Sequence, residues 1–474
     1  MSKPIFIQSF DRAITHSITD LSCVFPLFKD LPWAMLLDSA NSNHVNSQYD
    51  ILVAAPIHKV EAKNNRVFID GHDVESDPFS AINTTLKKAG LYQVKRPANA
   101  LDNDASQLPF LGGALGYFGY DTGRYIEKLP QHANNDINIP DMAVGIYHWA
   151  LIYDNKTRTL WLIDHSDNAQ QRFDDISQQL LTQQHININQ TFYITDQWSA
   201  NMSAKDYENK FNAVQRYIRE GDCYQINLAQ RFSASYSGDE WQAYRLLRKE
   251  NRAPFSAFLS FDEFSILSIS PERFLQLNGQ TIQTKPIKGT RPRSTNAEQD
   301  NALAAELKAA EKDRAENVMI VDLLRNDISK VSQPGTVKVP HLFEIESFPA
   351  VHHLVSTVVG EIAQPNTACD LLRAAFPGGS ITGAPKIRAM EIIEELEPHC
   401  RTVYCGSIGY ICATGNMDTS ITIRTLVAKD NTLFCWAGGG LVADSVMHSE
   451  YQETYDKVNK ILPVLASLNK LESN

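Results

Sequence analysis

The sequence predicts a mixed α+β chain with more than one packed unit, and three observations support this fold class. The 474 residues, 53.1 kDa in mass, exceed what one ordinary hydrophobic core holds. Short runs rich in Val, Ile, Leu and Tyr, separated by turn residues, recur through the first third and indicate strands. Longer segments with apolar residues at helical spacing follow them and indicate surface helices.

A polar stretch over residues 167–190 is the expected boundary between two parts of the chain. It is rich in Gln, Asp and Asn, yet its apolar residues keep helical spacing. A surface helix and loop therefore fit this stretch better than a disordered linker. We expect a β-rich N-terminal part over residues 1–190 and a second part over residues 200–470.

Two helices are predicted in the second part from their end signals. One begins at Ala204 and ends at Glu220, because Gly221 is the residue type that commonly terminates a helix. Another is expected to open at Thr295 with Glu298 as its capping-box partner and to continue to about Asn326.

Composition and charge exclude several classes of protein. The net charge of −11 argues against a nucleic-acid-binding protein, since phosphate contacts need concentrated Lys and Arg. No run approaches the ~20 apolar residues of a membrane span, and the first residues lack the apolar core of a signal peptide. The seven cysteines contain no Cys-x-x-Cys pair, so we expect reduced thiols in a cytoplasmic enzyme without zinc.

The segment 285–293, Lys-Pro-Ile-Lys-Gly-Thr-Arg-Pro-Arg, is the most informative in the chain. It follows two strand-like runs, and its prolines and glycine predict a turn that holds Lys288. Lys285, Arg291 and Arg293 would lower the pKa of Lys288 if they share its site, and a neutral lysine is a nucleophile. By itself this pattern fits an exposed turn lysine better, and only the segments further along the chain favour a nucleophile.

Two pairs of carboxylates are stacked one turn apart on predicted helices. Asp313 and Glu316 form one pair, and Glu450 and Glu453 form the other, with Lys457 a further turn along. Either pair alone fits a solvated helix face. Carboxylates from two helices, completed by water and substrate oxygens, would make the few-ligand site that Mg²⁺ prefers.

Two glycine-rich segments could present backbone N–H groups to an anionic ligand. They cover residues 376–386 and 437–442. The first lacks the Lys-Ser/Thr ending of a phosphate loop, so nucleotide binding is not supported.

Taken together in register, these segments resemble the chorismate-utilising enzymes, a family that includes anthranilate, isochorismate, salicylate and aminodeoxychorismate synthases. The resemblance implies an α+β fold: a large two-layer antiparallel β-sandwich flanked by helices, with the site between the layers. It makes residues 200–470 the chorismate-binding catalytic part. The segments that carry it are Ser270–Phe274, Lys285–Arg293, Arg314–Asp327, Gly383–Ile393, Ile423–Thr425 and Gly440–Ser445.

Two positions distinguish among the reactions of this family. Members that add water to chorismate carry a lysine where this chain has Gln225, so ammonia is the expected nucleophile. Aminodeoxychorismate synthases carry lysine at the position of Lys288, whereas anthranilate synthases carry alanine. The resemblance thus implies amination of chorismate at C4 for p-aminobenzoate and folate synthesis, with anthranilate formation as the alternative. A non-catalytic ligand-binding protein would not need the general acid Glu272 or a nucleophilic lysine.

The resemblance also implies a role for individual residues. Glu272 would protonate the leaving C4 hydroxyl, and Lys288 would form a covalent adduct at C2 that ammonia then displaces. The Mg²⁺ ligands and their supporting carboxylates would be Glu316, Glu453, Glu450 and Asp313. The substrate-binding residues would be Arg424, Tyr404, Lys457, Ser380, Thr290, Gly438, Gly439, Gly440, His353 and Gln225.

The ammonia-using relatives work with a glutaminase that delivers ammonia directly. This chain has no Cys-His-Glu pattern of a second, glutaminase domain, so the resemblance implies a separate glutaminase subunit in a heterodimer.

A tryptophan pocket is a further expectation for the N-terminal part. The segment Leu36–Ser39 resembles the Leu-Leu-Glu-Ser element of tryptophan-regulated anthranilate synthases, but it has Asp38 in place of the glutamate. A structurally bound tryptophan or a packed core is therefore an alternative to feedback control. The candidate pocket residues are Ser39, Tyr49, Pro254 and Phe255.

Overall fold

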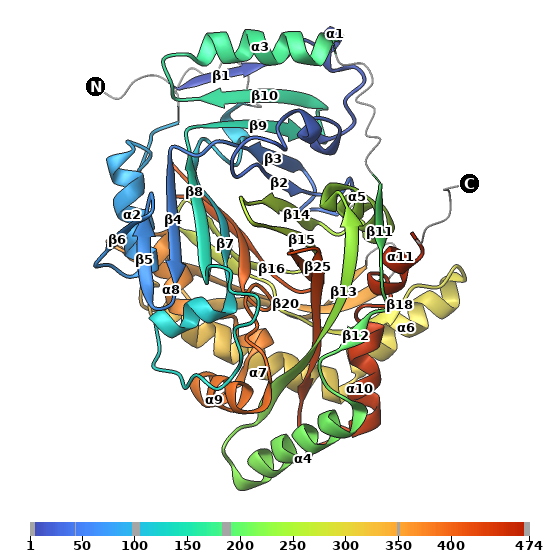
Figure 1. Cartoon of the computed structure of the whole chain (residues 1–474). Helices are drawn as coiled ribbons and strands as arrows, with labels where there is room; N and C mark the ends of the chain where they lie inside the picture. The colour runs from blue at the N-terminus through green and yellow to red at the C-terminus, as the bar shows by residue number, and fades with distance from the viewer. Residues whose placement is uncertain (1–4, 43, 97–104, 183–190, 348–350, 469–474) are drawn as a thin grey trace, which may run out of the picture.

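The computed structural model describes residues 5–42, 44–96, 105–182, 191–347 and 351–468, and it contains two large antiparallel sheets (Figure 1). The expected α+β sandwich is therefore confirmed. In spatial order the first sheet contains β1 (Phe6–Ser9), β10 (Thr159–Asp164), β9 (Trp149–Asp154), β3 (Tyr49–Val53), β2 (Met35–Asp38), β14 (Phe255–Ser260), β15 (Phe264–Ser270), β24 (Thr425–Lys429), β25 (Thr432–Leu441), β13 (Gln225–Gly238) and β11 (Phe192–Ile194), with β12 (Ser199–Ala200) and β21 (Gly383–Ala384) paired to β13.

The second sheet lies against the first and includes the segment predicted to hold the nucleophile. Its spatial order is β18 (Ile287–Pro292), β20 (Val351–Glu361), β17 (Thr281–Thr284), β16 (Arg273–Asn278), β23 (Met417–Ile421), β22 (Ser407–Cys412), β7 (Gly113–Phe118), β8 (Met142–Tyr147), β4 (His58–Lys63), β5 (Arg66–Ile69) and β6 (His72–Val74), with β19 (Lys338–Ser347) paired to β20.

Helices cover the outside of the two sheets, and none in the described part of the chain is long and apolar enough to cross a membrane. The helices are α1 (Arg12–Thr15), α2 (Pro78–Lys88), α3 (Ala169–Thr182), α4 (Ala204–Glu220), α5 (Glu240–Asn251), α6 (Ala297–Ala309), α7 (Glu311–Ser329), α8 (Ala368–Ala375), α9 (Lys386–Leu396), α10 (Met447–Asp456) and α11 (Leu462–Ala466). Short 3₁₀ turns are η1 (Leu21–Cys23), η2 (Phe25–Leu27), η3 (Ala105–Gln107), η4 (Tyr120–Tyr125) and η5 (Gly379–Ile381).

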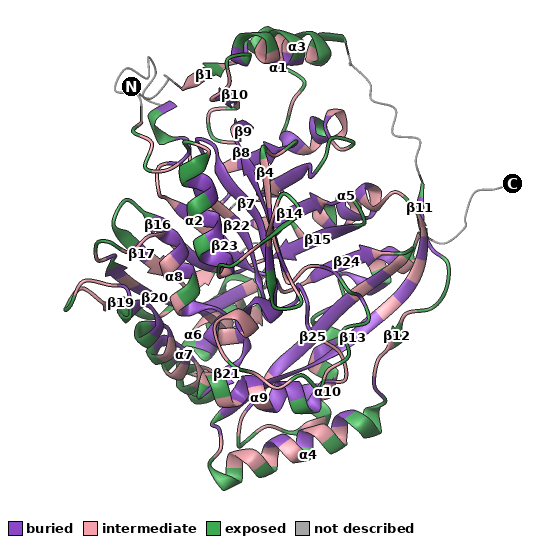
Figure 2. Cartoon of the chain, turned by 60° about the vertical axis from the view of Figure 1, so that its left-hand side comes forward, coloured by how far each residue is buried: buried purple, intermediate pink, exposed green. Residues whose placement is uncertain are grey.

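In both sheets, a strand from the N-terminal part of the chain pairs with a strand from the C-terminal part. In the first sheet β2 pairs with β14, and in the second β7 pairs with β22. The largest core fills the space between the sheets; for example, the ring of Tyr117 on β7 meets that of Phe264 on β15 edge-on. Figure 2 shows the consequence: the central strands are buried, and exposed residues gather on outer helices such as α3 and α4.

The helix predicted over Ala204–Glu220 is confirmed, and Gly221 follows it in the left-handed conformation with φ of 84°. The predicted Thr295 cap is wrong. Asn296 caps α6 instead, because its side chain accepts the free N–H groups of Glu298 and Gln299. The expected single long helix is broken at Ala310, whose extended backbone (ψ 107°) separates α6 from α7.

Lys288 lies in strand β18 and not in a turn, which corrects the prediction from its prolines and glycine. It pairs with Leu354, and Thr290 pairs with His353, so the residue between them is left over as a β-bulge. Gly289 occupies that position with φ of 74°, a left-handed conformation that glycine adopts without strain. The glycine that suggested a turn therefore allows a bulge.

Candidate active site

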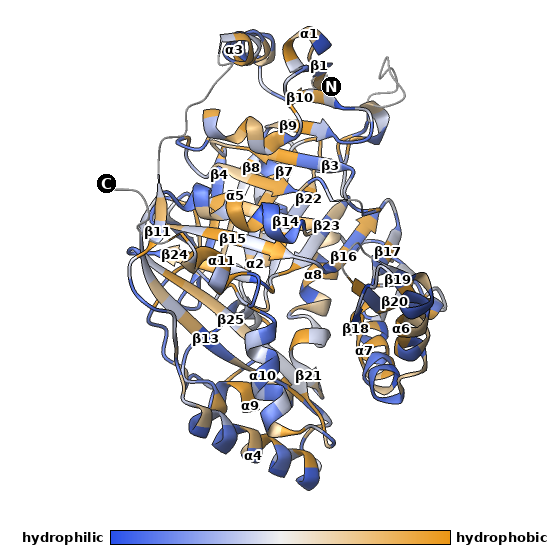
Figure 3. Ribbon diagram, turned by 90° about the vertical axis from the view of Figure 1, so that its right-hand side faces the viewer, coloured by the Kyte–Doolittle hydropathy of each residue, from blue (hydrophilic) through white to orange (hydrophobic). Residues whose placement is uncertain are grey.

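A cavity of about 630 Å³ lies between the two sheets, with walls from β18, α7, η5, β25 and α10. In Figure 3, α6 and α7 lie beside β18–β20, while α10 lies beside β25, and the cavity residues come from both groups. The predicted site residues that line it are Glu272, Lys288, Thr290, Asp313, Glu316, His353, Ser380, Tyr404, Arg424, Gly438, Gly440, Glu450, Glu453 and Lys457.

Lys288 projects from β18 into this cavity, and its Nζ donates to the backbone oxygen of Ser380 at 3.3 Å. The residue as a whole is partly accessible at the wall, but burial of the amine lowers its pKa. Glu316 and Glu272 act in the opposite direction, because a nearby carboxylate favours the charged amine. Desolvation outweighs both carboxylates.

The three cations expected to lower the pKa of Lys288 are each paired with a carboxylate, which corrects the sequence argument, although Arg291 and Asp313 themselves line this cavity. Each forms an ion pair with its own carboxylate, so none adds a free charge beside Lys288. The pairs are Lys285 with Glu346, Arg291 with Glu306 and Asp313, and Arg293 with Asp300. The low pKa of Lys288 comes from burial, which sequence spacing does not reveal.

Glu272 is the second titratable group in the wall and is 8% exposed. Burial raises its pKa to about 7, although Lys288, the backbone N–H of Ile287 and Arg424 favour the charged form. A carboxyl with this pKa is substantially protonated at neutral pH. It can therefore donate a proton to a leaving oxygen, which an ordinary glutamate cannot do efficiently.

The two predicted carboxylate pairs face the same cavity from different helices. Asp313 and Glu316 come from α7, and Glu450 and Glu453 come from α10. Burial raises the pKa of Glu316, and the charges of Asp313 and Glu450 raise it further. Glu453 forms an ion pair with Lys457 at 2.7 Å. Cations also lie beside two of the other carboxylates: Arg291 is 3.5 Å from Asp313, and Lys312 is 3.8 Å from Glu450.

The chemistry of this donor set fits a hard cation that keeps ligands from water and substrate. Within the described ranges, no three carboxylate, imidazole or thiol side chains converge closely enough to hold a metal by themselves. A Cβ atom on Gly439 would lie 3.2 Å from an oxygen of Glu450 and 3.3 Å from one of Glu453. The glycine leaves space in front of these carboxylates, as a site completed by other oxygen ligands requires.

The opposite side of the cavity carries groups suited to an anionic substrate. Arg424 is half-buried, and no carboxylate of the described chain lies within ion-pairing distance of it, so its planar fork is available to a ligand carboxylate. Burial lowers the pKa of His353 to about 4, and its Nδ1 lies 2.8 Å from the hydroxyl of Thr290. His353 is therefore neutral at neutral pH. Tyr404 stacks on Trp436 in the wall.

Gln225 lies behind the wall and not in it, with its Nε2 only 2.1 Å from where a Cβ of Gly440 would stand. Its Oε1 is buried and has no hydrogen-bond partner within the described chain. Asn227, two residues along β13, does line the cavity but was not predicted. The sequence did contain a signal for Asn227: alternate residues of a strand point to the same face, and Asn227 is two residues after the predicted Gln225.

The comparisons with known proteins agree with this geometry. The sequence matches the chorismate binding enzyme family over residues 34–463. The chain belongs to this family. It is 52% identical to aminodeoxychorismate synthase component 1 of Escherichia coli strain K12, over 93% of this chain and 95% of that protein. It is 53% identical to the Klebsiella aerogenes protein of the same name, over 92% and 94%.

A solved structure extends the comparison to a related enzyme. Anthranilate synthase component I from Streptococcus pneumoniae superposes with a TM-score of 0.77 and 32% sequence identity. The match covers 89% of this chain and 93% of the other. The fold inferred for this member of the chorismate binding enzyme family is thus seen in a relative.

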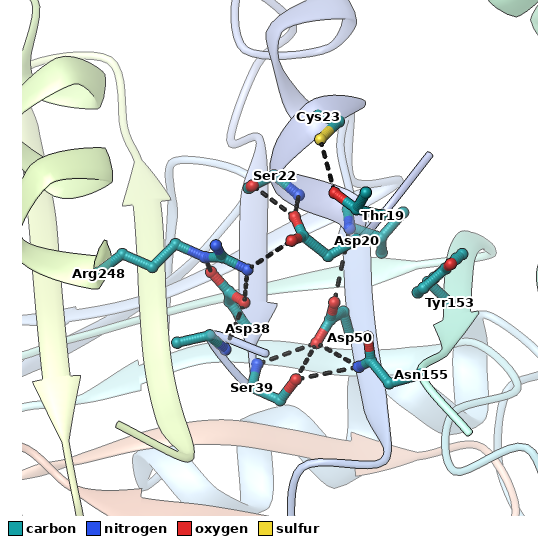
Figure 4. Close-up of polar contacts among 12 residues, drawn as sticks. Thr19, Asp20, Ser22, Cys23, Asp38, Ser39, Asp50, Tyr153, Asn155 and Arg248 are labelled. Carbon is teal, nitrogen blue, oxygen red and sulfur yellow. Dashed lines mark hydrogen bonds and ion pairs between the residues drawn. The ribbon is translucent and has the colours of Figure 1, made fainter. Parts of the chain in front are cut away.

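A second, smaller cavity of about 110 Å³ lies where β2 and β14 meet the second sheet. All four candidate tryptophan-pocket residues line it: Ser39, Tyr49, Pro254 and Phe255. Asp38, which replaces the expected glutamate, also lines it, but its carboxylate forms an ion pair with Arg248 (Figure 4).

The polar groups behind this second cavity form one network (Figure 4). Arg248 also pairs with Asp20 at 3.0 Å, so one guanidinium serves two carboxylates. No cation of the described chain pairs with Asp50; its Oδ1 accepts from the Ser39 N–H at 2.9 Å and hydroxyl at 2.6 Å. Burial and the charge of Asp38 raise the pKa of Asp50 to about 7.

Proposed function

We propose that this chain aminates chorismate at C4, forming 4-amino-4-deoxychorismate with its enolpyruvyl group retained, as the supply step for p-aminobenzoate and folate. The observation that carries the proposal is that Lys288 and Glu272 lie in one cavity wall. Burial lowers the pKa of Lys288 and raises the pKa of Glu272. The relatives named aminodeoxychorismate synthase component 1 support the same reaction.

The proposed mechanism assigns one proton and one nucleophile to this chain. Glu272, protonated, donates its proton to the C4 oxygen, so that water rather than hydroxide leaves. Lys288, neutral, attacks C2 as the C4–O bond breaks and both ring double bonds shift by one position. Ammonia then adds at C4 and expels the lysine amine. The fork of Arg424 would hold a substrate carboxylate throughout.

Mg²⁺ is the cofactor we propose for the carboxylate side of the cavity. Glu316 and Glu453 would hold it directly, with Asp313 and Glu450 in support, and the backbone of Gly438–Gly440 beside them. When bound, the cation would neutralise charge on a substrate carboxylate. Because the four carboxylates come from two different helices, space remains between them for oxygen atoms of water and substrate.

Ammonia supply requires a further assumption about a partner. Ammonia is mostly protonated near neutral pH, and the relatives' name "component 1" indicates a second component in those enzymes. We infer that a separate glutaminase subunit delivers ammonia to this chain in a cytoplasmic heterodimer. Chorismate, ammonia and the glutaminase are the proposed partners, with no role for nucleic acid or membrane.

Product identification tests this proposal directly. The purified chain would be incubated with chorismate, ammonium salt at mildly alkaline pH and Mg²⁺, with a metal-free sample as control. We expect a product that retains the enolpyruvyl mass and requires Mg²⁺. Anthranilate with released pyruvate would contradict the proposal and favour the tryptophan branch.

Tryptophan binding in the second cavity is a separate proposal, supported by its lining of Ser39, Tyr49, Pro254 and Phe255. Titration calorimetry with L-tryptophan tests binding, and assays with and without it test regulation. A binding signal lost in Ser39→Leu would support the pocket. No heat at any concentration would leave the cavity as packing space only.

A further inference from the structure

A buried arginine that the proposed chemistry does not use lies behind the cavity wall. Arg401, in the loop between α9 and β22, is 2% exposed. Its Nη2 and Nε pair with the two oxygens of Glu397 at 2.6 and 2.9 Å. A buried ion pair adds little net stability, because both charges lose their water. Its other bonds therefore matter more for its role.

The remaining guanidinium bonds go to two residues of the cavity wall. Nη1 donates to the carbonyl of Ile381 at 3.0 Å, and Nη2 donates to the carbonyl of Asn227 at 2.6 Å. Both residues line the cavity. The Asn227 side chain donates to the same Ile381 carbonyl at 2.8 Å, so the three residues form a closed unit. Four bonds thus use most of the five N–H donors that arginine has.

Ile381 is one peptide away from the group that contacts Lys288. The carbonyl of Ser380, which accepts from the Lys288 amine at 3.3 Å, shares a planar peptide with the N–H of Ile381. Both belong to η5, a single 3₁₀ turn that has few bonds of its own. Only the φ and ψ angles of Ile381 separate the two carbonyls, so holding the Ile381 carbonyl restricts the direction of the Ser380 carbonyl.

The same guanidinium supports a third wall residue. It lies 5.6 Å from the ring centre of Tyr404 on the cavity side and 4.8 Å from that of Tyr120 on the other. Arg401 is thus in contact with η5, β13 and Tyr404 at once, and all three contribute to the cavity.

We propose that Arg401 is a positioning residue for the reaction: it fixes the Ser380 carbonyl and thereby aims the Lys288 amine into the cavity. The inference rests on the proposed function of Lys288 as nucleophile. It goes beyond that function in assigning the orientation of the nucleophile to a residue that never touches substrate.

The first test compares two arginine-to-lysine substitutions in the full chain. Arg401→Lys keeps the charge but cannot form the four-bond fork, so we expect kcat to fall about 10²-fold with KM little changed, since small misplacement of a reacting group has this effect. The matched control is Arg172→Lys, which breaks the ion pair to buried Asp164 and the contact with Trp149, far from the cavity. The control should lose thermal stability but keep kcat.

The second test needs neither chorismate nor partner and so does not depend on the proposed function. Lys288 would be labelled with a small acylating reagent across a pH series, and its modification read by peptide mass spectrometry. A carbonyl acceptor favours the protonated amine, so its loss in Arg401→Lys should move half-maximal labelling of Lys288 to lower pH. The Arg172→Lys chain should label like the original.

The outcomes separate positioning from simple stability. Unchanged Lys288 labelling, or a kcat loss no larger than that of Arg172→Lys, would overturn the proposal. If Arg401→Lys fails to fold, Glu397→Gln carries the test, because it keeps Arg401 and removes the charge of its partner, while the amide oxygen can still accept the Ala229 N–H. A smaller change in the same direction is then expected, and no change in labelling would equally overturn the proposal. If the original chain forms no aminodeoxychorismate, the proposed function fails, but the labelling result still shows whether Arg401 positions the Lys288 amine.

Discussion

The proposed active-site cavity and the smaller cavity beside β2 and β14 differ in how their charged side chains are paired. In the larger one Arg424 has no carboxylate within ion-pairing distance in the described chain, whereas the carboxylates Asp313, Glu450 and Glu453 pair with Arg291, Lys312 and Lys457. In the smaller one the charges are paired internally: Asp38 with Arg248, and Asp418 with Arg273.

This difference distinguishes a site prepared for a charged ligand from one that is largely self-sufficient. Unpaired buried charges cost free energy, and a folded protein keeps them where a ligand or a reaction compensates for them. The larger cavity therefore has the character of a reaction site. Behind the smaller cavity, Asp50 has no ion-pair partner in the described chain and is held by hydrogen bonds, so its substitution tests this comparison.

The largest effect is expected from removing the nucleophile. Lys288→Ala should abolish formation of the C4-amino product or divert the reaction, while chorismate binding persists through Arg424. Mass spectrometry of the product and calorimetric titration of chorismate measure the two properties. Undiminished aminodeoxychorismate synthesis in this variant would rule out the covalent step.

Removal of the general acid should cost nearly as much and should change the pH profile. Glu272→Gln keeps the side chain's size but cannot donate the proton, so we expect kcat/KM to fall about 10²- to 10⁴-fold. In the original chain, kcat/KM at constant free ammonia should decline as pH rises above about 7, where Glu272 loses its proton. A profile without this decline would remove Glu272 from the mechanism.

A smaller effect is expected from one carboxylate of the proposed cation site. Glu453→Gln should raise the Mg²⁺ concentration needed for half-maximal activity roughly tenfold, because a neutral amide is a weaker ligand. Binding of Mn²⁺ followed by electron paramagnetic resonance gives a readout independent of turnover. Asp456→Asn, on the same helix and at the cavity edge, is the matched control. Equal behaviour of the two variants would argue against Glu453 as a ligand.

The smallest effect concerns the stability of the second cavity. The folded-state pKa of Asp50, about 7, lies above its ordinary value of 3.8, so the folded protein holds a proton that the unfolded chain has released. Stability should therefore fall as pH rises from about 4 to about 7. Asp50→Asn removes this penalty and should stabilise the chain at pH 8 by on the order of 1 kcal/mol, with no gain at pH 4.

A matched substitution gives the opposite sign. Asp38→Asn leaves Arg248 without its close partner and should destabilise the protein at pH 8, as broken buried ion pairs do. Urea unfolding at both pH values measures both variants. Destabilisation by Asp50→Asn at pH 8 would mean that Asp50 is charged and satisfied in the folded protein.

Much of the site was predictable from the sequence because it depends on residue types in short segments. Spacing by one helical turn placed Asp313 with Glu316 and Glu450 with Glu453, and all four line the cavity. The helix ending at Gly221 followed from local backbone preference alone. The sandwich itself followed from the family resemblance rather than from periodicity, since local patterns do not specify which strands pair.

Other features required the tertiary structure because they arise between segments far apart in the chain. The pKa of Lys288 is lowered by burial between two sheets, not by the charged neighbours beside it in sequence, which are paired with carboxylates. Arg401 is an unremarkable loop arginine in the sequence, yet it bonds residues 20 and 174 positions away.

The sequence by itself determined the family and indicated the proposed acid, amine and carboxylates, because these are identities of residues. Only the tertiary structure decided which charges are paired and which are left for a ligand. The physical reason is that desolvation and ion pairing depend on distance in space, and the packing of two sheets sets those distances.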